Sequence, residues 1–116
     1  MAKRIKKATR IAVIESGGNV FADLQVADAE EELAKAKLAS HIRHTVQQRR
    51  LTQVQAARLM GLDQPKVSAL MNGRLAGFSS DRLMRLLTIL GQDIDIVLRS
   101  KPRRRERGHI RILETA

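Results

Sequence analysis

The sequence predicts a mainly α-helical protein, a small helical bundle that carries one short C-terminal β-strand. Three observations support this fold class. Apolar residues recur at helical spacing between about residues 28 and 90, glycines divide that pattern into segments, and strict alternation replaces it over residues 93–99. At 116 residues, the chain is long enough for one modest core and too short for two well-built ones.

Composition excludes several classes of protein. The chain has no cysteine, and therefore no disulfide and no thiolate metal ligand. The apolar run at residues 11–14 is too short for a signal peptide, and no run approaches the roughly 18 residues that a membrane span needs. We therefore expect a cytoplasmic protein with no membrane partner and no cofactor.

The charge distribution divides the chain into three parts. The formal net charge of +10 favours a polyanionic partner. Basic residues prevail in residues 1–20, 40–80 and 99–116, whereas residues 21–39 are acidic. We interpret these as an extended N-terminal segment (1–27), a helical domain (28–99) and a basic mobile tail (100–116) that contains "KPRRRER".

The first predicted helix begins at Asp28. Residues 1–27 lack helical periodicity, and turn-forming residues at 16–19 separate two apolar stretches. Asp28 and Glu31 have the spacing of a capping box, which predicts a helix that continues to about Arg50. Its apolar face consists of Leu38, Ala39, Ile42 and Val46.

Two short helices follow, joined by a tight turn. Thr52 and Gln55 form a second capping box, so a helix is predicted over residues 53–60, and Gly61 permits the positive φ that ends it. Asp63 caps the next helix, in whose first turn Pro65 is tolerated because the missing amide has no intrahelical partner. Two helices joined in this way are typical of a helix-turn-helix, with Val67, Leu70 and Met71 buried and Gly73 at the end.

The last helix and the strand complete the domain. Ser79 is the expected N-cap, Phe78 and Leu83 have the spacing of a hydrophobic staple, and the helix ends at Gly91. Its core stripe is Leu83, Leu86, Leu87 and Leu90. The strand over residues 93–99 needs a partner. That partner is either the N-terminal "RIAVI" or, as we favour, the same strand of a second subunit, through Ile94, Ile96 and Leu98.

The segment "LTQVQAARLMGLDQPKVSALMNG" resembles the helix-turn-helix of the XRE or Cro/C1 class and aligns without a gap with that of the phage lambda repressor. The segments "SGGNVFADL", "DAEEELAKAKLA", "QPKVSALMNGRLAGFSSDRLMRLLTILG" and "DIDIVLR" together resemble the HigA-type antitoxins and related transcription factors, over about residues 16–99. The resemblance implies a lambda-repressor-like bundle that binds a double-stranded DNA operator and represses transcription.

The resemblance also implies roles for individual residues. Gln53 matches a phosphate clamp and Gln64 an adenine contact, which suits the pairing of a Gln amide with adenine N6 and N7. On the second helix of the motif, the other expected DNA contacts are Lys66, Ser68 and Ala69. Thr52 before the first helix, and Asn72 and Arg74 after the second, are expected to contact phosphates.

The resemblance to HigA-type antitoxins implies a second partner, a basic RNase-type toxin, and the acidic residues 21–39 suit such a protein. The predicted contact residues are Ile11, Val13, Phe21, Leu24, Asp28 and Glu31. A regulator without a toxin is the alternative, and the scarcity of aromatic residues disfavours an RNA-binding protein. No catalytic motif is present, and His41 and His44 lack a third metal ligand, so we expect neither an enzyme nor a metal site.

Overall fold

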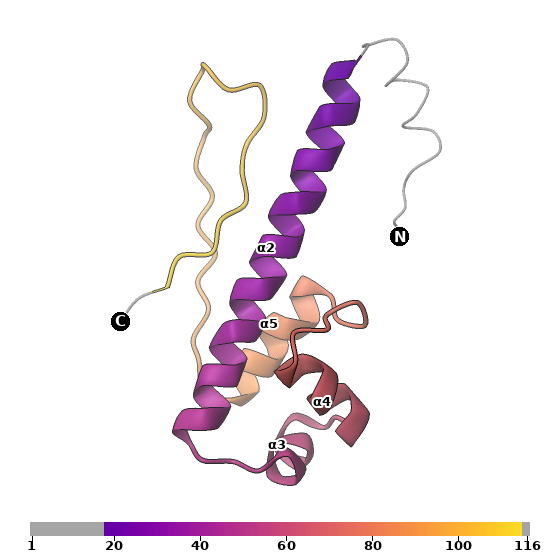
Figure 1. Ribbon diagram of the computed structural model, residues 1–116. Helices are drawn as coiled ribbons and strands as arrows, with labels where there is room; N and C mark the ends of the chain where they lie inside the picture. Colours follow the sequence, from indigo (N-terminus) through magenta and orange to yellow (C-terminus); the bar gives the residue numbers. More distant parts are fainter. Residues whose placement is uncertain (1–17, 115–116) are drawn as a thin grey trace.

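A computed structural model describes residues 18–114 of the chain, with side chains from residue 24 onward. It contains four helices: α2 (Gly18–Gln48), α3 (Gln53–Met60), α4 (Gln64–Met71) and α5 (Ser80–Ile89). Figure 1 shows α3, α4 and α5 gathered around the C-terminal half of the long helix α2, whose N-terminal half extends away from them. The prediction of a mainly helical bundle is confirmed. Within the described residues, no helix is both long and apolar enough to cross a membrane.

The hydrophobic core lies where these helices meet. Its members include the predicted apolar faces of α2 and α5, and the side chains of Ile42, Val67, Leu70 and Leu83 are fully buried. Burial of one such side chain stabilises the fold by roughly 1.5–3 kcal/mol. Because α2, α4 and α5 each supply a fully buried residue, the same core that folds the domain also fixes the position of α4.

The predicted starts of the three short helices are confirmed. Thr52 accepts a hydrogen bond from the amide of Gln55 (3.1 Å), and the Gln55 side chain accepts one from the Thr52 amide (2.8 Å). Asp63 and Ser79 cap α4 and α5 through their side-chain oxygens. Gly61 ends α3 at a φ of +69°, which glycine adopts without strain. Each N-cap side chain thus satisfies one of the amides that a helix start leaves unpaired.

The predicted start of the first helix is wrong. Helix α2 already includes Gly18 and Asn19, where a turn was expected, so Asp28 and Glu31 lie inside the helix with exposed side chains instead of capping it. Residues 20–27 are rich in good helix formers, and one glycine costs a helix only about 1 kcal/mol. The predicted extended segment at residues 11–14, including Ile11 and Val13, lies outside the described residues.

The predicted C-terminal β-strand is not supported, because no strand is present within residues 18–114 of the single chain. Residues 93–99 are extended, but they make no backbone hydrogen bonds with another described segment. Ile94 packs against the core, whereas Ile96 and Leu98 are 71% and 89% exposed. A strand requires a ladder partner, which alternation in the sequence cannot supply by itself.

The chain returns along α2 after α5 (Figure 1), and we call residues 92–114 the C-terminal strap. The strap contains most of residues 100–116, which the sequence analysis interprets as a mobile tail. Glu30 of α2 nevertheless pairs with Arg107 (3.2 Å) and His109 of the strap, and it accepts a hydrogen bond from the Ile110 amide (3.2 Å). His41, expected at the surface, is half-buried between Gln92 and Glu114. The strap is therefore attached to α2 at two polar points.

Candidate DNA-binding interface

Helices α3 and α4 form a helix-turn-helix with a closely packed corner. The amide of Leu62 donates to the carbonyl of Ala57 (2.9 Å), and both side chains are buried. The small Ala57 side chain allows the two helices to approach, while Leu62 fills the turn. With Val67 and Leu70 turned into the core, the opposite side of α4 remains free for a ligand.

The two glutamines predicted to contact DNA are both exposed, and each is the first residue of its helix. Gln53 opens α3 and Gln64 opens α4, each directly after an N-cap residue. A side chain in the first turn of the second helix is well placed to meet base edges when that helix enters the major groove. Thr52 is exposed too, but its hydroxyl already caps α3.

The remaining predicted residues follow α4 toward its C-terminal end. Ser68 and Ala69 are half-buried on the helix, and Asn72 donates from its side-chain amide to the Ser68 carbonyl (2.8 Å). Arg74 lies exposed in the loop between α4 and α5. The surface of α4 therefore changes from a glutamine at its start to a cation just beyond its end, an order that suits base contacts followed by phosphate contacts.

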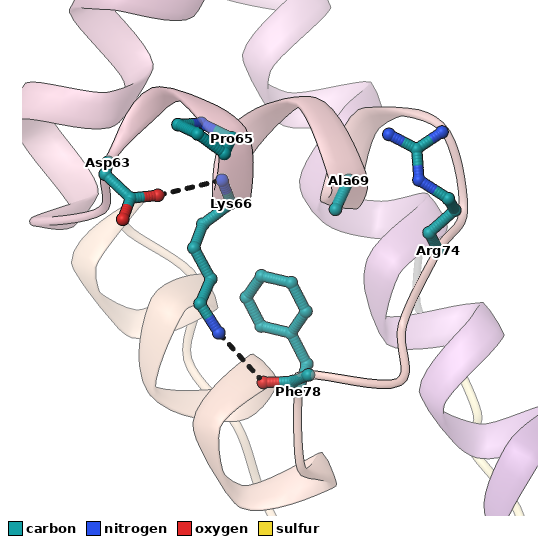
Figure 2. Close-up of a pocket in the computed structure, with 7 residues that line it drawn as sticks. Asp63, Pro65, Lys66, Ala69, Arg74 and Phe78 are labelled. Atoms are coloured by element: carbon teal, nitrogen blue, oxygen red, sulfur yellow. Dashed lines mark hydrogen bonds between the residues drawn. The ribbon is translucent and has the colours of Figure 1, made fainter.

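Lys66 takes an unexpected direction. Figure 2 shows its side chain reaching across to the α4–α5 loop, where the ammonium donates to the Gly77 carbonyl (3.4 Å). The same nitrogen lies 5.3 Å from the centre of the Phe78 ring, close enough for a cation–π interaction. Lys66, Ala69, Arg74 and Phe78 are among the residues that line a cleft of about 290 Å³ between α4 and this loop.

Two arginines outside the motif, Arg43 in α2 and Arg49 in the turn directly after it, bond to the C-terminal ends of α4 and α5. Arg43 donates to the carbonyl of Leu70 (3.3 Å) in the last turn of α4, and Arg49 donates to that of Leu90 (3.4 Å) at the end of α5. Cations favour helix C-termini, where carbonyls are unpaired and the helix dipole is negative. Sequence reasoning missed both arginines. Neither α4 nor α5 has a basic residue in its last turn, and this could have indicated that cations from elsewhere in the chain bind these helix ends.

The charge around the motif suits a polyanion. Residues 40–80 contain six lysines and arginines and a single acidic residue, Asp63, whose carboxylate caps α4. Arg58 on α3 and Arg74 beyond α4 are exposed, so they remain available to phosphates. The exposed recognition surface and its basic surroundings together define the class: a helix-turn-helix DNA-binding protein.

Comparison with known proteins agrees with this class. A family model described as a helix-turn-helix domain matches residues 20–99. A solved structure of a protein named as an XRE family transcriptional regulator is 46% identical, with a TM-score of 0.71, and the match covers 76% of this chain and 99% of that one. No match is found among curated proteins. The chain belongs to the XRE family of DNA-binding transcriptional regulators.

Proposed function

We propose that this regulator binds a specific double-stranded operator by inserting α4 into the major groove, with Gln64 as the base-reading residue. The exposed position of Gln64, in the first turn of a helix whose other face is fixed in the core, is the observation that carries the proposal. A Gln amide pairs bidentately with adenine N6 and N7. Ser68 and Ala69 lie further along the same helix, and Ala69 offers a methyl group for contact with thymine.

Phosphate contacts position the protein on the duplex in this proposal. Gln53 at the start of α3, Thr52 before it, and Asn72 and Arg74 after α4 flank the base-reading surface on either side. Such contacts supply affinity that depends on salt and hardly on sequence.

Base reading by Gln64 is tested with an operator selected from a pool of random duplexes. Gln64→Ala should weaken binding to that operator by about 1–3 kcal/mol and change binding to an unrelated duplex little. Arg74→Ala is the matched control, because loss of a phosphate contact should weaken both complexes similarly. Equal losses on both duplexes for Gln64→Ala would remove it from the base-reading role.

We propose that the protein binds this operator as a homodimer joined through residues 93–99. Ile96 and Leu98 are largely exposed in an extended segment, which supports pairing with a second copy. Ile94, near the start of this segment, packs against the core of its own chain. A two-fold axis would place two recognition helices about 34 Å apart, one turn of DNA. Ile96→Pro removes a ladder donor and should shift sedimentation from dimer to monomer. An unchanged dimer would assign the contact to another surface.

We further propose that the regulator is an antitoxin that represses its own operon and neutralises a basic, RNase-type toxin. The support lies on the N-terminal half of α2, which extends away from α3 and α4 (Figure 1) and on which Leu24, Asp28 and Glu31 are exposed. Ile11, Val13 and the side chain of Phe21, which would complete the contact, lie outside the described residues. Carboxylates there would steer a basic partner.

Charge reversal separates the antitoxin from a regulator without a toxin. Asp28→Lys combined with Glu31→Lys should abolish co-purification of a toxin expressed from the native operon and leave operator binding unchanged. Glu106→Lys, an exposed reversal elsewhere, is the control. Capture of the toxin by the double variant, or an operon without a toxin, would favour the regulator alone.

A further inference from the structure

Lys66 stands on the helix that faces DNA, yet its contacts lie within the protein. Its ammonium donates to the Gly77 carbonyl (3.4 Å) and lies 5.3 Å from the centre of the Phe78 ring. The Phe78 ring is itself buried, and the guanidinium carbon of Arg82 in α5 lies 5.4 Å from its centre. Lys66 therefore connects α4 to the loop that leads into α5 (Figure 2).

That loop carries Arg74, and its backbone is fixed at both ends. The Arg74 amide donates to the carbonyl of Ala69 (2.8 Å), and the Phe78 amide donates to that of Leu75 (3.0 Å). Gly73, with a φ of +76°, turns the chain out of α4 just before Arg74. Between the two backbone bonds, Leu75 packs against the core, and the contact between Lys66 and Gly77 adds a side-chain link from the loop to α4.

We propose that Lys66 is a positioning residue: by holding the loop at Gly77 and Phe78, it sets the place from which Arg74 meets a DNA phosphate, and it does not itself read a base. This inference rests on the proposed role of Arg74 in operator binding. A flexible ammonium is suited to the task, because it can donate to a carbonyl and lie over an aromatic ring at the same time.

Gly77 provides a variant that disturbs this contact without changing charge. A Cβ atom at Gly77 would lie 3.1 Å from the Lys66 ammonium nitrogen, so the end of the lysine side chain would have to shift by a few tenths of an ångström. The backbone φ of Gly77 is not in the left-handed region, so alanine adds no strain of its own. Gly77→Ala therefore displaces the ammonium and retains every cation, whereas Lys66→Met removes the cation and keeps most of the side-chain bulk.

The decisive measurement is a set of double-mutant cycles on the affinity for the selected operator. Lys66→Met should weaken binding by about two- to tenfold, the effect of one lost hydrogen bond, and Gly77→Ala should weaken it in the same direction. In the Arg74→Ala background, Lys66→Met should produce no further loss, because its effect acts through Arg74. In the Lys66→Met background, Gly77→Ala should likewise add nothing.

Two outcomes would overturn the inference. Equal losses for Lys66→Met with and without Arg74 would make Lys66 an independent DNA contact. An operator affinity that Lys66→Met leaves unchanged would give it no role. Arg58→Met, which removes an exposed cation from α3, controls for the general loss of charge and should be additive with Arg74→Ala.

Hydrogen exchange in the free protein distinguishes failure of this inference from failure of the proposed function. Lys66→Met should speed exchange at the Phe78 amide by about two- to tenfold, and Arg58→Met should not. If the wild-type protein selects no operator, the proposed function fails while this measurement still decides whether Lys66 holds the loop. Unchanged exchange in Lys66→Met would show that the loop needs no such link.

Discussion

The two ends of α2 are stabilised in different ways. Around its C-terminal half, α3, α4 and α5 bury a continuous aliphatic core in which Ile42 and Leu83 are fully enclosed. Along its N-terminal half, polar contacts at Glu30 attach the C-terminal strap, whose Ile94 and Ile112 side chains pack, partly buried, against the edge of that core.

This difference implies that the two regions respond separately to perturbation. A core shared by several helices opens only when the domain unfolds, whereas a segment with few buried contacts opens locally at a lower free energy. The recognition helix belongs to the first region, so its geometry should persist when the strap detaches. Substitutions in the strap that destabilise the whole domain strongly, or core substitutions that do not, would contradict this division.

The largest expected effect comes from the core. Ile42→Ala leaves a cavity among fully buried neighbours and should lower the free energy of unfolding by about 2–5 kcal/mol. Ile110→Ala, in the strap, is the matched control: its side chain is 59% exposed, and the change should stay within about 0.5 kcal/mol. Urea denaturation of the two variants measures both values. Comparable losses would mean that the strap is part of the cooperative core.

A smaller effect is expected at the helix caps of α3, α4 and α5, which lie in the first region. Thr52→Ala removes the acceptor for the Gln55 amide and should destabilise the domain by about 1 kcal/mol. Thr52→Ser keeps the hydroxyl oxygen and should cost less. Because Thr52 is also a proposed phosphate contact, thermal unfolding without DNA is the appropriate measurement. Equal stability for the alanine and serine variants would show that the capping box contributes nothing.

The accuracy of sequence-based prediction follows the same division. Helix starts at Thr52, Asp63 and Ser79 depend on side chains that bond amides three residues away, so local sequence contains the whole signal. The capping signal at Asp28 is equally local, yet the neighbouring turns of α2 continue through it. A capping pattern establishes that a helix can start at a residue, and the preceding sequence decides whether one does.

Contacts that span long stretches of chain were not predictable in this way. Gln64 and Arg74 are exposed, as their positions within the motif predict, but the direction of Lys66 depends on Gly77, eleven residues further on. The bond from Arg43 to Leu70 and the attachment of the strap to Glu30 join residues that are further apart still. Each depends on tertiary packing, which a single sequence does not reveal without knowledge of which elements meet.

The smallest expected change in overall stability, and the most local one, concerns Glu30. Glu30→Ala removes the acceptor for the Ile110 amide and the carboxylate beside Arg107 and His109. Alanine is the better helix former, which offsets part of the loss within α2. We therefore expect the free energy of unfolding to change by less than about 0.5 kcal/mol, while exchange at the Ile110 amide rises about tenfold or more, because a bond to a charged acceptor is lost.

The control for this variant is Glu32→Ala, which removes an exposed carboxylate two residues further along the same helix. Glu32 pairs only with Lys35 (3.7 Å) among the contacts of the described residues, so its loss should leave the strap protected. Hydrogen exchange of both variants, read at Ile110 in the strap and at Leu83 in the core, separates local release from general destabilisation. Faster exchange at Leu83 in Glu30→Ala would show that the strap and the core unfold together, and the two ends of α2 would then form one cooperative unit.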